Sequence, residues 1–264
     1  ASMRAAEAAA VSDAEKLRLR LERLIYDNLR EYVALEKSKR EGNLAAAAKS
    51  CARMLELQAG QNRITPFMGW TPYPCYGLDW EQRRLEAAAA LMNGPAGELV
   101  ALLPERAAFR TDPFDDGRYE RWHEPSTDLS SWKSILSTFG WETQGLPGML
   151  NERGYPYRGL AWYQFDVNVP ESARGKPLFL HGPAVVNEAW VWVNGHYVGR
   201  RPYQNVWFRP HELDMDVSGV IEPGKTHRIT LRVLANWDVW GANGIYERMF
   251  LYAQKQRAGE PADR

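Results

Sequence analysis

The chain has 264 residues, 45% of them hydrophobic and 25% charged, which is the composition of an ordinary globular protein with room for two domains. Lys and Arg total 33 and Asp and Glu also total 33, so no net positive charge attracts nucleic acid or an anionic membrane. We expect neither partner, and no apolar run approaches the roughly 18 residues of a membrane span. The number of aromatic residues, 11 Trp and 12 Tyr, is unusual. Most of them should lie in the core, but sugar sites are also built on aromatic faces.

The first part of the chain has the periodicity of helices. Apolar residues recur at three- and four-residue spacing over residues 5–41, which predicts one long amphipathic helix. Asn43 is a suitable N-cap for a second, Ala-rich helix over residues 44–60. Asp79 is the expected cap of a third helix over residues 80–92. Three amphipathic helices need a partner surface, which is either one another or a neighbouring domain.

After Pro104 the period changes to two. Apolar and polar side chains alternate over residues 163–169 and again over residues 229–234, as in half-buried strands. Asn194-Gly195 between two apolar runs predicts a tight β-hairpin. No helical pattern separates the strands, so an antiparallel sandwich is favoured over a parallel α/β sheet.

A set of short motifs follows in order between residues 102 and 252. The motifs are Phe109-Arg110-Thr111-Asp112, Trp122, Ser131-Trp132, Phe139-Gly140-Trp141-Glu142, Tyr157-Arg158-Gly159-Leu160-Ala161-Trp162-Tyr163, Val191-Trp192-Val193-Asn194-Gly195-His196-Tyr197-Val198-Gly199, Asp238-Val239-Trp240 and Gly244-Ile245-Tyr246-Glu247-Arg248. Together they resemble the jelly-roll sugar-binding domain of glycoside hydrolase family 2, the group of β-galactosidases, β-glucuronidases and β-mannosidases.

The resemblance implies a mainly β protein. We expect a galactose-binding-like, antiparallel jelly-roll β-sandwich over residues 99–254, preceded by an α-helical segment of about three helices over residues 1–98 and followed by a disordered tail over residues 255–264. In the family the acids that cleave the glycosidic bond lie on a separate barrel domain, and nothing in this chain resembles that barrel. Glycoside hydrolysis needs two carboxylates at a defined separation, and no acidic pair here has a motif behind it.

We therefore expect a non-catalytic carbohydrate-binding module of a larger bacterial polysaccharide-degrading protein, not an enzyme. Its expected partners are a polysaccharide or oligosaccharide and the catalytic domain of the parent protein, and the resemblance implies a secreted or periplasmic location. One alternative is an accessory sandwich that completes the active site of a glycoside hydrolase barrel. A second, that the chain is itself a lyase or esterase, has no motif in its favour.

A pyranose presents an apolar C–H face and a ring of hydroxyls, so its site combines an aromatic platform with planar polar side chains. In a sandwich such groups lie on loops at one end, because strand side chains are committed to the core. Three loops have this composition. The predicted carbohydrate-binding residues are Asn236, Trp237, Asp238, Trp240 and Asn243 in the first, Arg200, Arg201, Tyr203, Gln204 and Asn205 in the second, and Trp141 and Glu142 in the third.

The first two loops also have a purely structural interpretation. The resemblance puts Asp238 where the β-galactosidase group has an acid that reaches the sugar, but Asp238 can equally cap a turn above a packed Trp240. In the second loop the family has glycines that are replaced here, so a solvated, positively charged turn is the alternative. If that loop binds, Arg200 and Arg201 would suit an acidic sugar such as a uronate.

No cofactor is expected. Asp112, Asp115 and Asp116 supply hard oxygen atoms for a structural calcium ion, although their spacing does not match a calcium loop and an acidic turn is the alternative. The five histidines lack metal-ligand spacing. Cys51 and Cys75 are too few for a disulfide framework, and the sequence does not show whether they are bridged.

Overall fold

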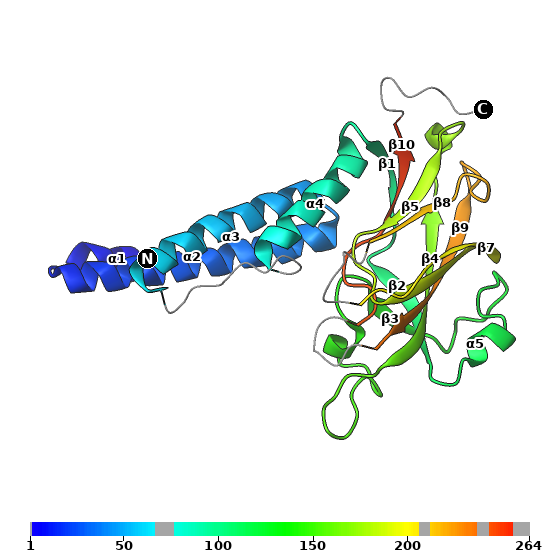
Figure 1. Ribbon diagram of the computed structural model, residues 1–264, viewed down its shortest axis with the longest axis horizontal. Helices are drawn as coiled ribbons and strands as arrows, with labels where there is room; N and C mark the ends of the chain where they lie inside the picture. Colours follow the sequence, from blue (N-terminus) through cyan, green and yellow to red (C-terminus); the bar gives the residue numbers. More distant parts are fainter. Residues whose placement is uncertain (1, 67–76, 206–211, 237–242, 256–264) are drawn as a thin grey trace. The chain divides into compact units, whose positions relative to one another are not determined.

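The structure is a computed structural model that describes residues 2–66, 77–205, 212–236 and 243–255. It divides into two compact units (Figure 1). The helical unit contains the chain up to Lys39 and Asn43–Glu86. The sandwich unit contains Arg40–Gly42 and the chain from Ala87 onward.

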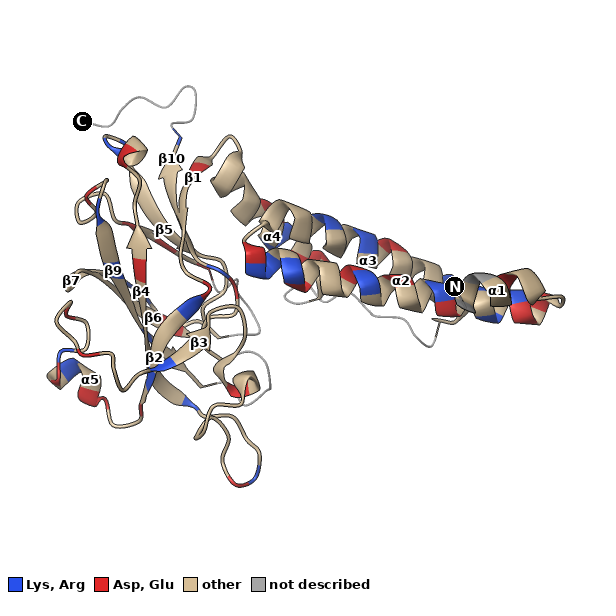
Figure 2. Cartoon of the chain, turned by 180° about the vertical axis from the view of Figure 1, so that it is seen from behind, with Lys and Arg blue, Asp and Glu red and all other residues tan. Residues whose placement is uncertain are grey.

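The helical unit is built from amphipathic helices. Figure 2 shows charges of both signs spread along them, and none of the described helices is both long and apolar enough to cross a membrane. The helices are α1 (Ser2–Ala9), α2 (Asp13–Glu41), α3 (Leu44–Ile64) and α4 (Leu78–Asn93), and the last residues of α2 and α4 belong to the sandwich unit.

The prediction of one continuous helix over residues 5–41 is wrong, because a capping box separates α1 from α2. The Ser12 hydroxyl accepts a hydrogen bond from the Glu15 amide at 3.2 Å, and the Glu15 carboxylate accepts one from the Ser12 amide at 2.9 Å. These reciprocal bonds satisfy amide groups at the start of α2 that have no partner within the helix. A new helix therefore begins at this point.

The N-cap of α3 is confirmed, but its end is later than expected. The Asn43 side chain accepts a hydrogen bond from the Ala46 amide at 3.1 Å. Gly60 does not stop the helix, which continues to Ile64. A Cβ at Gly60 would lie 3.2 Å from a methyl carbon of Leu24 in α2, so the glycine permits close packing of the two helices.

The third helix starts earlier than the sequence pattern indicated. α4 begins at Leu78, so Asp79 lies in its first turn and is not its cap. There its negative charge is favourable next to the positive end of the helix dipole. Cys51 is buried in α3, whereas Cys75 lies outside the described residues.

The sandwich unit consists of two antiparallel sheets, which confirms the mainly β fold. The smaller sheet has the order β1-β10-β5-β8 and the larger has the order β3-β2-β4-β9-β6-β7. The strands are β1 (Gly97–Leu102), β2 (Arg106–Asp112), β3 (Lys133–Leu136), β4 (Gly159–Asn168), β5 (Leu178–Gly182), β6 (Glu188–Val193), β7 (His196–Arg201), β8 (Leu213–Asp216), β9 (Thr226–Ala235) and β10 (Phe250–Gln254). Between them lie the short helix α5 (Asp116–Tyr119) and 3-10 turns at Trp141–Gln144 and Glu171–Ala173.

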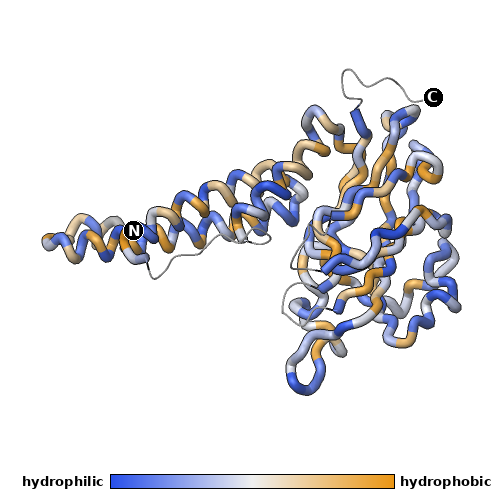
Figure 3. Tube along the Cα trace, viewed as in Figure 1, coloured by the Kyte–Doolittle hydropathy of each residue, from blue (hydrophilic) through white to orange (hydrophobic). Residues whose placement is uncertain are grey.

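The core lies between the two sheets, where strands carry apolar residues (Figure 3). β4 and β9 pair over ten residues from Gly159↔Ala235 to Asn168↔Thr226. Every second residue of both strands faces inward and is buried, which confirms the alternation expected from the sequence. Burying one large aliphatic or aromatic side chain contributes about 1.5–3 kcal/mol, so this ladder is a main source of stability.

The predicted hairpin is also confirmed. Asn194 and Gly195 form the two-residue connection between β6 and β7, and both have positive φ, 49° and 83°. This is the left-handed backbone that a type I′ turn requires and that asparagine and glycine tolerate.

The outward face of the larger sheet is covered by residues 113–132, which we call the β2–β3 segment. The Arg232 guanidinium of β9 pairs with Asp115 at 2.5 Å. The Gln164 amide of β4 donates to the Trp122 carbonyl at 2.5 Å, and the rings of Trp122 and Trp162 meet edge to face. These contacts hold the segment against the sheet. Trp190 and Trp192 lie on the same face, where they contact Arg232 and Trp162.

Gly117 is the closest point of contact between this segment and the sheet. A Cβ there would lie 2.5 Å from atoms of both Trp122 and Trp162. Replacing Gly117 by alanine should therefore lower the free energy of unfolding by about 1–3 kcal/mol through overpacking. Chemical denaturation measures this, with Gly219→Ala as the control because no heavy atom lies within 4 Å of its added Cβ. Equal stability of the two variants would contradict the expected packing.

Candidate functional site

Several strands of the larger sheet begin or end at the same edge of the sandwich. β9 ends at Ala235, β6 begins at Glu188 and β7 ends at Arg201, and their pairing brings these three positions together. The loops that leave this edge, residues 184–187, 202–205, 236 and 243–247, are called the end loops here. They include most of the described residues that the sequence assigned to a sugar site.

Asn187 holds three of the end loops together. Its side-chain amide donates to the Gln204 carbonyl at 3.0 Å, and its side-chain oxygen accepts from the Asn236 amide at 3.0 Å. Its own backbone carbonyl accepts from the Gln204 amide at 2.9 Å. Asn187 is 1% exposed, so these bonds are shielded from competing water.

This network presents a small polar surface. The Tyr203 hydroxyl donates to the Asn236 side-chain oxygen at 3.0 Å, and both side chains are exposed. Gln204 is partly exposed beside them, and Asn205 follows on the surface. A phenol ring next to amide groups is the combination that stacks on a sugar and hydrogen bonds to its hydroxyls.

The two arginines of this region point in opposite directions. Arg200 is half-exposed, pairs with Glu188 and lies 5.5 Å from the ring of Trp190. Arg201 is buried and donates to the Val185 carbonyl at 2.6 Å. Burial lowers the pKa of Arg201 to about 10, which still leaves it charged at neutral pH. They therefore do not form a joint site for a carboxylate.

A second buried group lies under the 243–247 loop. The Trp141 amide donates to the Asn243 carbonyl at 3.1 Å, and the Asn243 side chain donates to Glu142 at 3.2 Å. The three side chains are at most 2% exposed. Burial, together with the nearby Glu142 charge, raises the pKa of the Tyr163 hydroxyl. Trp141, Glu142 and Asn243 thus pack beneath the loop and do not offer an exposed platform.

The residues at the centre of the sequence prediction are outside the described residues. Trp237, Asp238 and Trp240 belong to the stretch between Asn236 and Asn243. Their assignment to a sugar site stays a prediction. The same holds for the predicted disordered tail, of which only Lys255 is described; its amide donates to the Ala96 carbonyl at 3.1 Å.

Two of the three candidate calcium ligands, Asp112 and Asp115, have protein partners. Asp112 accepts hydrogen bonds from the Trp162 indole at 2.7 Å and the Gly117 amide at 3.2 Å. Asp115 pairs with Arg232. Within the described ranges, no group of three or more His, Cys, Asp or Glu side chains is arranged to hold a metal ion. These contacts are compatible with an acidic turn, and whether the three aspartates bind calcium stays a prediction.

Asn187 is the main residue that the sequence reasoning missed. Its position, immediately before the strand that begins at Glu188, suggested no chemistry. The available signal was an asparagine within an apolar stretch, because a polar side chain buried there must find hydrogen-bond partners.

The fold and these loops define an antiparallel β-sandwich with a polar, partly aromatic surface at one end. No protein-family model matches the chain. A β-galactosidase of Priestia megaterium is 25% identical over 165 residues, which cover 53% of this chain and 15% of that protein. A β-glucuronidase of Paenibacillus borealis is 29% identical over 131 residues, which cover 49% of this chain and 20% of that protein.

The resemblance to the β-galactosidases and β-glucuronidases of glycoside hydrolase family 2 is thus confirmed over about half of the chain. The chain spans only 11–20% of the length of these curated relatives. Among solved structures, a β-glucuronidase of Ruminococcus gnavus aligns with 60% of this chain and 29% of its own, at 16% identity and a TM-score of 0.49.

Proposed function

We propose that the sandwich is a non-catalytic carbohydrate-binding module of a larger polysaccharide-degrading protein. The proposal is carried by the end-loop surface, where exposed Tyr203 and Asn236 are held by Asn187. The similarity to enzymes named for galactosides and glucuronides supports a sugar as the ligand. Such a site is shallow and weak, since few hydrogen bonds leave little net free energy after desolvation.

The parent protein supplies what the module lacks. In this proposal a separate catalytic domain carries the glycosidic acids, and tethering raises the effective concentration of sugar at that domain. A secreted or periplasmic location follows from a polysaccharide substrate outside the cell.

Affinity electrophoresis of the whole chain through gels containing different polysaccharides tests the proposal. We expect retardation of the wild type by at least one polysaccharide, and loss of retardation in Tyr203→Ala, Trp237→Ala and Asp238→Ala. The melting temperature of Tyr203→Ala should stay unchanged, because Tyr203 is exposed. If all three variants are retarded as strongly as the wild type, the end loops are not the sugar site.

An accessory role is the second candidate, and the burial of Trp141, Glu142 and Asn243 favours it. Polar side chains that are turned inward stabilise a rigid wall, which a neighbouring barrel could use to complete its active site. Titration of the chain with oligosaccharides separates the two functions. An accessory wall gives no saturable binding to any sugar in the panel, whereas a binding module does.

A further inference from the structure

Two adjoining depressions lie beside β2 where its pairing with β3 ends, and we call them together the groove. β3 pairs with β2 only from Leu136↔Arg106 to Lys133↔Phe109, whereas β2 continues to Asp112. The ladder on this side therefore stops before β2 does. Two depressions open at this point, and Arg110 and Ser131 line both of them.

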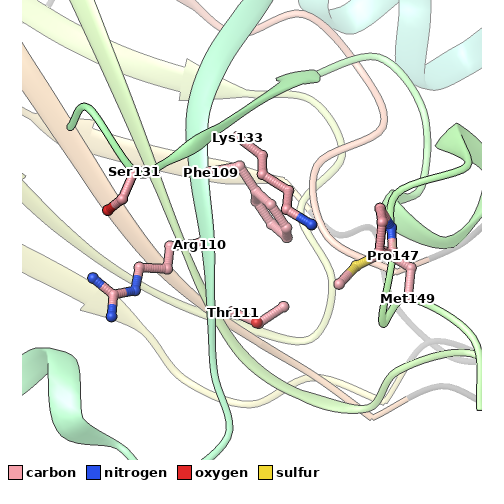
Figure 4. A pocket seen from close by; sticks show the side chains of 7 residues that line it. All are labelled: Phe109, Arg110, Thr111, Ser131, Lys133, Pro147 and Met149. Atoms are coloured by element: carbon pink, nitrogen blue, oxygen red, sulfur yellow. The ribbon is translucent and has the colours of Figure 1, made fainter.

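The first depression has a volume of about 220 Å³ (Figure 4). Figure 4 shows Lys133, Phe109 and Met149 on one side of β2, with Arg110 and Ser131 on the other. Its lining contains a hydroxyl from Thr111 and apolar atoms, but no acidic residue. A volume below the ~300–1,000 Å³ of small-molecule sites holds only part of a ligand.

The second depression is larger, about 430 Å³, and mainly polar. The rings of Trp122 and Trp132 meet there edge to face at 5.5 Å, and the Arg110 guanidinium lies 4.0 Å above Trp122. Its other lining residues are carboxylates, hydroxyls and one further arginine: Glu120, Arg121, Glu124, Ser126, Thr127, Asp128 and Ser131.

The charges in this groove are unevenly distributed, because its three acids all line the larger depression. Glu124 pairs with Arg121, and Glu120 accepts from the Trp122 indole at 2.7 Å. Asp128 accepts from both the amide and the hydroxyl of Ser130, at 2.9 Å each. Each acid thus has a hydrogen-bond partner, although only Glu124 is paired with a cation.

The two remaining cations have no such partner. Within the described part of the chain, neither Arg110 nor Lys133 makes an ion pair, and both are exposed. The smaller depression is lined by both of these cations and by no acid, so it favours an anionic group over a neutral one.

We infer that the groove binds an acidic sugar, a uronate within an oligosaccharide. Its carboxylate binds Lys133 in the smaller depression, where the apolar side chains of Pro147 and Met149 face the C–H side of the ring. The next sugar occupies the larger depression, where carboxylates and hydroxyls accept and donate hydrogen bonds to its hydroxyl groups. This deepens the proposed carbohydrate-binding function and rests on it, but it uses different residues from the end loops.

Affinity electrophoresis with polygalacturonate as the acidic probe and galactan as the neutral probe tests the inference. Lys133→Met removes the ammonium group and keeps an unbranched apolar side chain. We expect it to weaken binding of polygalacturonate about tenfold, the effect of losing one charge-assisted hydrogen bond. Lys133→Arg should retain most of the binding.

Lys225→Met is the matched control, because it removes the same charge from an exposed turn that lines neither depression. It should bind as the wild type does. Added sodium chloride should weaken binding by the wild type more than by Lys133→Met, since screening acts on the charge pair. Unchanged melting temperatures exclude unfolding as the cause.

The outcomes separate the two proposals. Equal binding by Lys133→Met and wild type, or stronger binding to galactan than to polygalacturonate, overturns the groove. If Tyr203→Ala then abolishes binding, the end-loop proposal stands alone. Weakened binding in Lys133→Met with normal binding in Tyr203→Ala supports the groove and overturns the end loops. If the wild type binds neither probe and no polysaccharide of the wider panel, the end-loop proposal and the groove proposal are both overturned.

Discussion

Replacing Trp141 by alanine should lower the free energy of unfolding by about 3–5 kcal/mol, the usual range for removing a fully buried indole. The ring is 0% exposed and contacts Phe109 and Tyr157, with centroids 5.9 and 5.7 Å away. Its indole nitrogen donates to the Tyr157 carbonyl at 3.1 Å, so alanine also leaves that carbonyl without its donor. Urea denaturation followed by tyrosine and tryptophan fluorescence measures the change.

Phe114→Ala is the control for this variant. Phe114 is also a large aromatic residue, but it is 81% exposed, so its removal should change stability by less than about 0.5 kcal/mol. A Trp141→Ala protein as stable as Phe114→Ala would show that the Trp141 ring is not in the core. The ring would then be free to stack on a sugar, as the sequence first suggested.

Replacing Asn187 by alanine should destabilise the protein by about 2–4 kcal/mol and weaken sugar binding at the end loops. The change leaves the Gln204 carbonyl and the Asn236 amide without their side-chain partner in a shielded place. Each buried polar group that loses its partner costs about 1–3 kcal/mol. Because the Asn187 side chain ties the 202–205 loop to Asn236, their surface should lose its shape.

Gln204→Ala distinguishes the loop network from direct sugar contact. Gln204 bonds to Asn187 through its backbone, so its side chain can be removed without breaking those bonds. Denaturation and affinity electrophoresis on both variants give two separate readouts. We expect Gln204→Ala to stay near wild-type stability. Matching losses of stability in the two variants would contradict the role assigned to the Asn187 side chain.

The strands were readable from the sequence because their pattern and their environment agree. Alternation over 163–169 and 229–234 reflects one face on the core and one face outward, which is also how β4 and β9 are built. The hairpin at Asn194-Gly195 was also predictable, since few other residues tolerate positive φ at both positions of a two-residue turn.

The helix break was missed because two local signals compete. The apolar periodicity continues across Ser12, whereas the Ser12–Glu15 capping box ends one helix and starts another. The box satisfies backbone groups that periodicity ignores. Giving the Ser12–Glu15 capping pattern the same weight as the apolar periodicity would have predicted the break between α1 and α2.

The site was harder to predict, because composition shows which groups are present and not where they point. Trp141, Glu142 and Asn243 have sugar-binding chemistry, yet their side chains are turned into the protein. Arg200 and Arg201 are adjacent in sequence but lie on opposite faces of β7, one exposed and one buried. The groove at Arg110 and Lys133 depends on where the pairing of β3 with β2 ends. The local sequence pattern does not predict that position.

The order of strands in the smaller sheet has a consequence for synthesis. β10, the last strand among the described residues, lies between β1 and β5, which come from the beginning and the middle of the sandwich sequence. A nascent chain on the ribosome cannot complete this sheet until residues 250–254 have emerged, so β1 and β5 wait as unpaired edges. Products that terminate early would keep those edges exposed, which makes them substrates for chaperones and proteases.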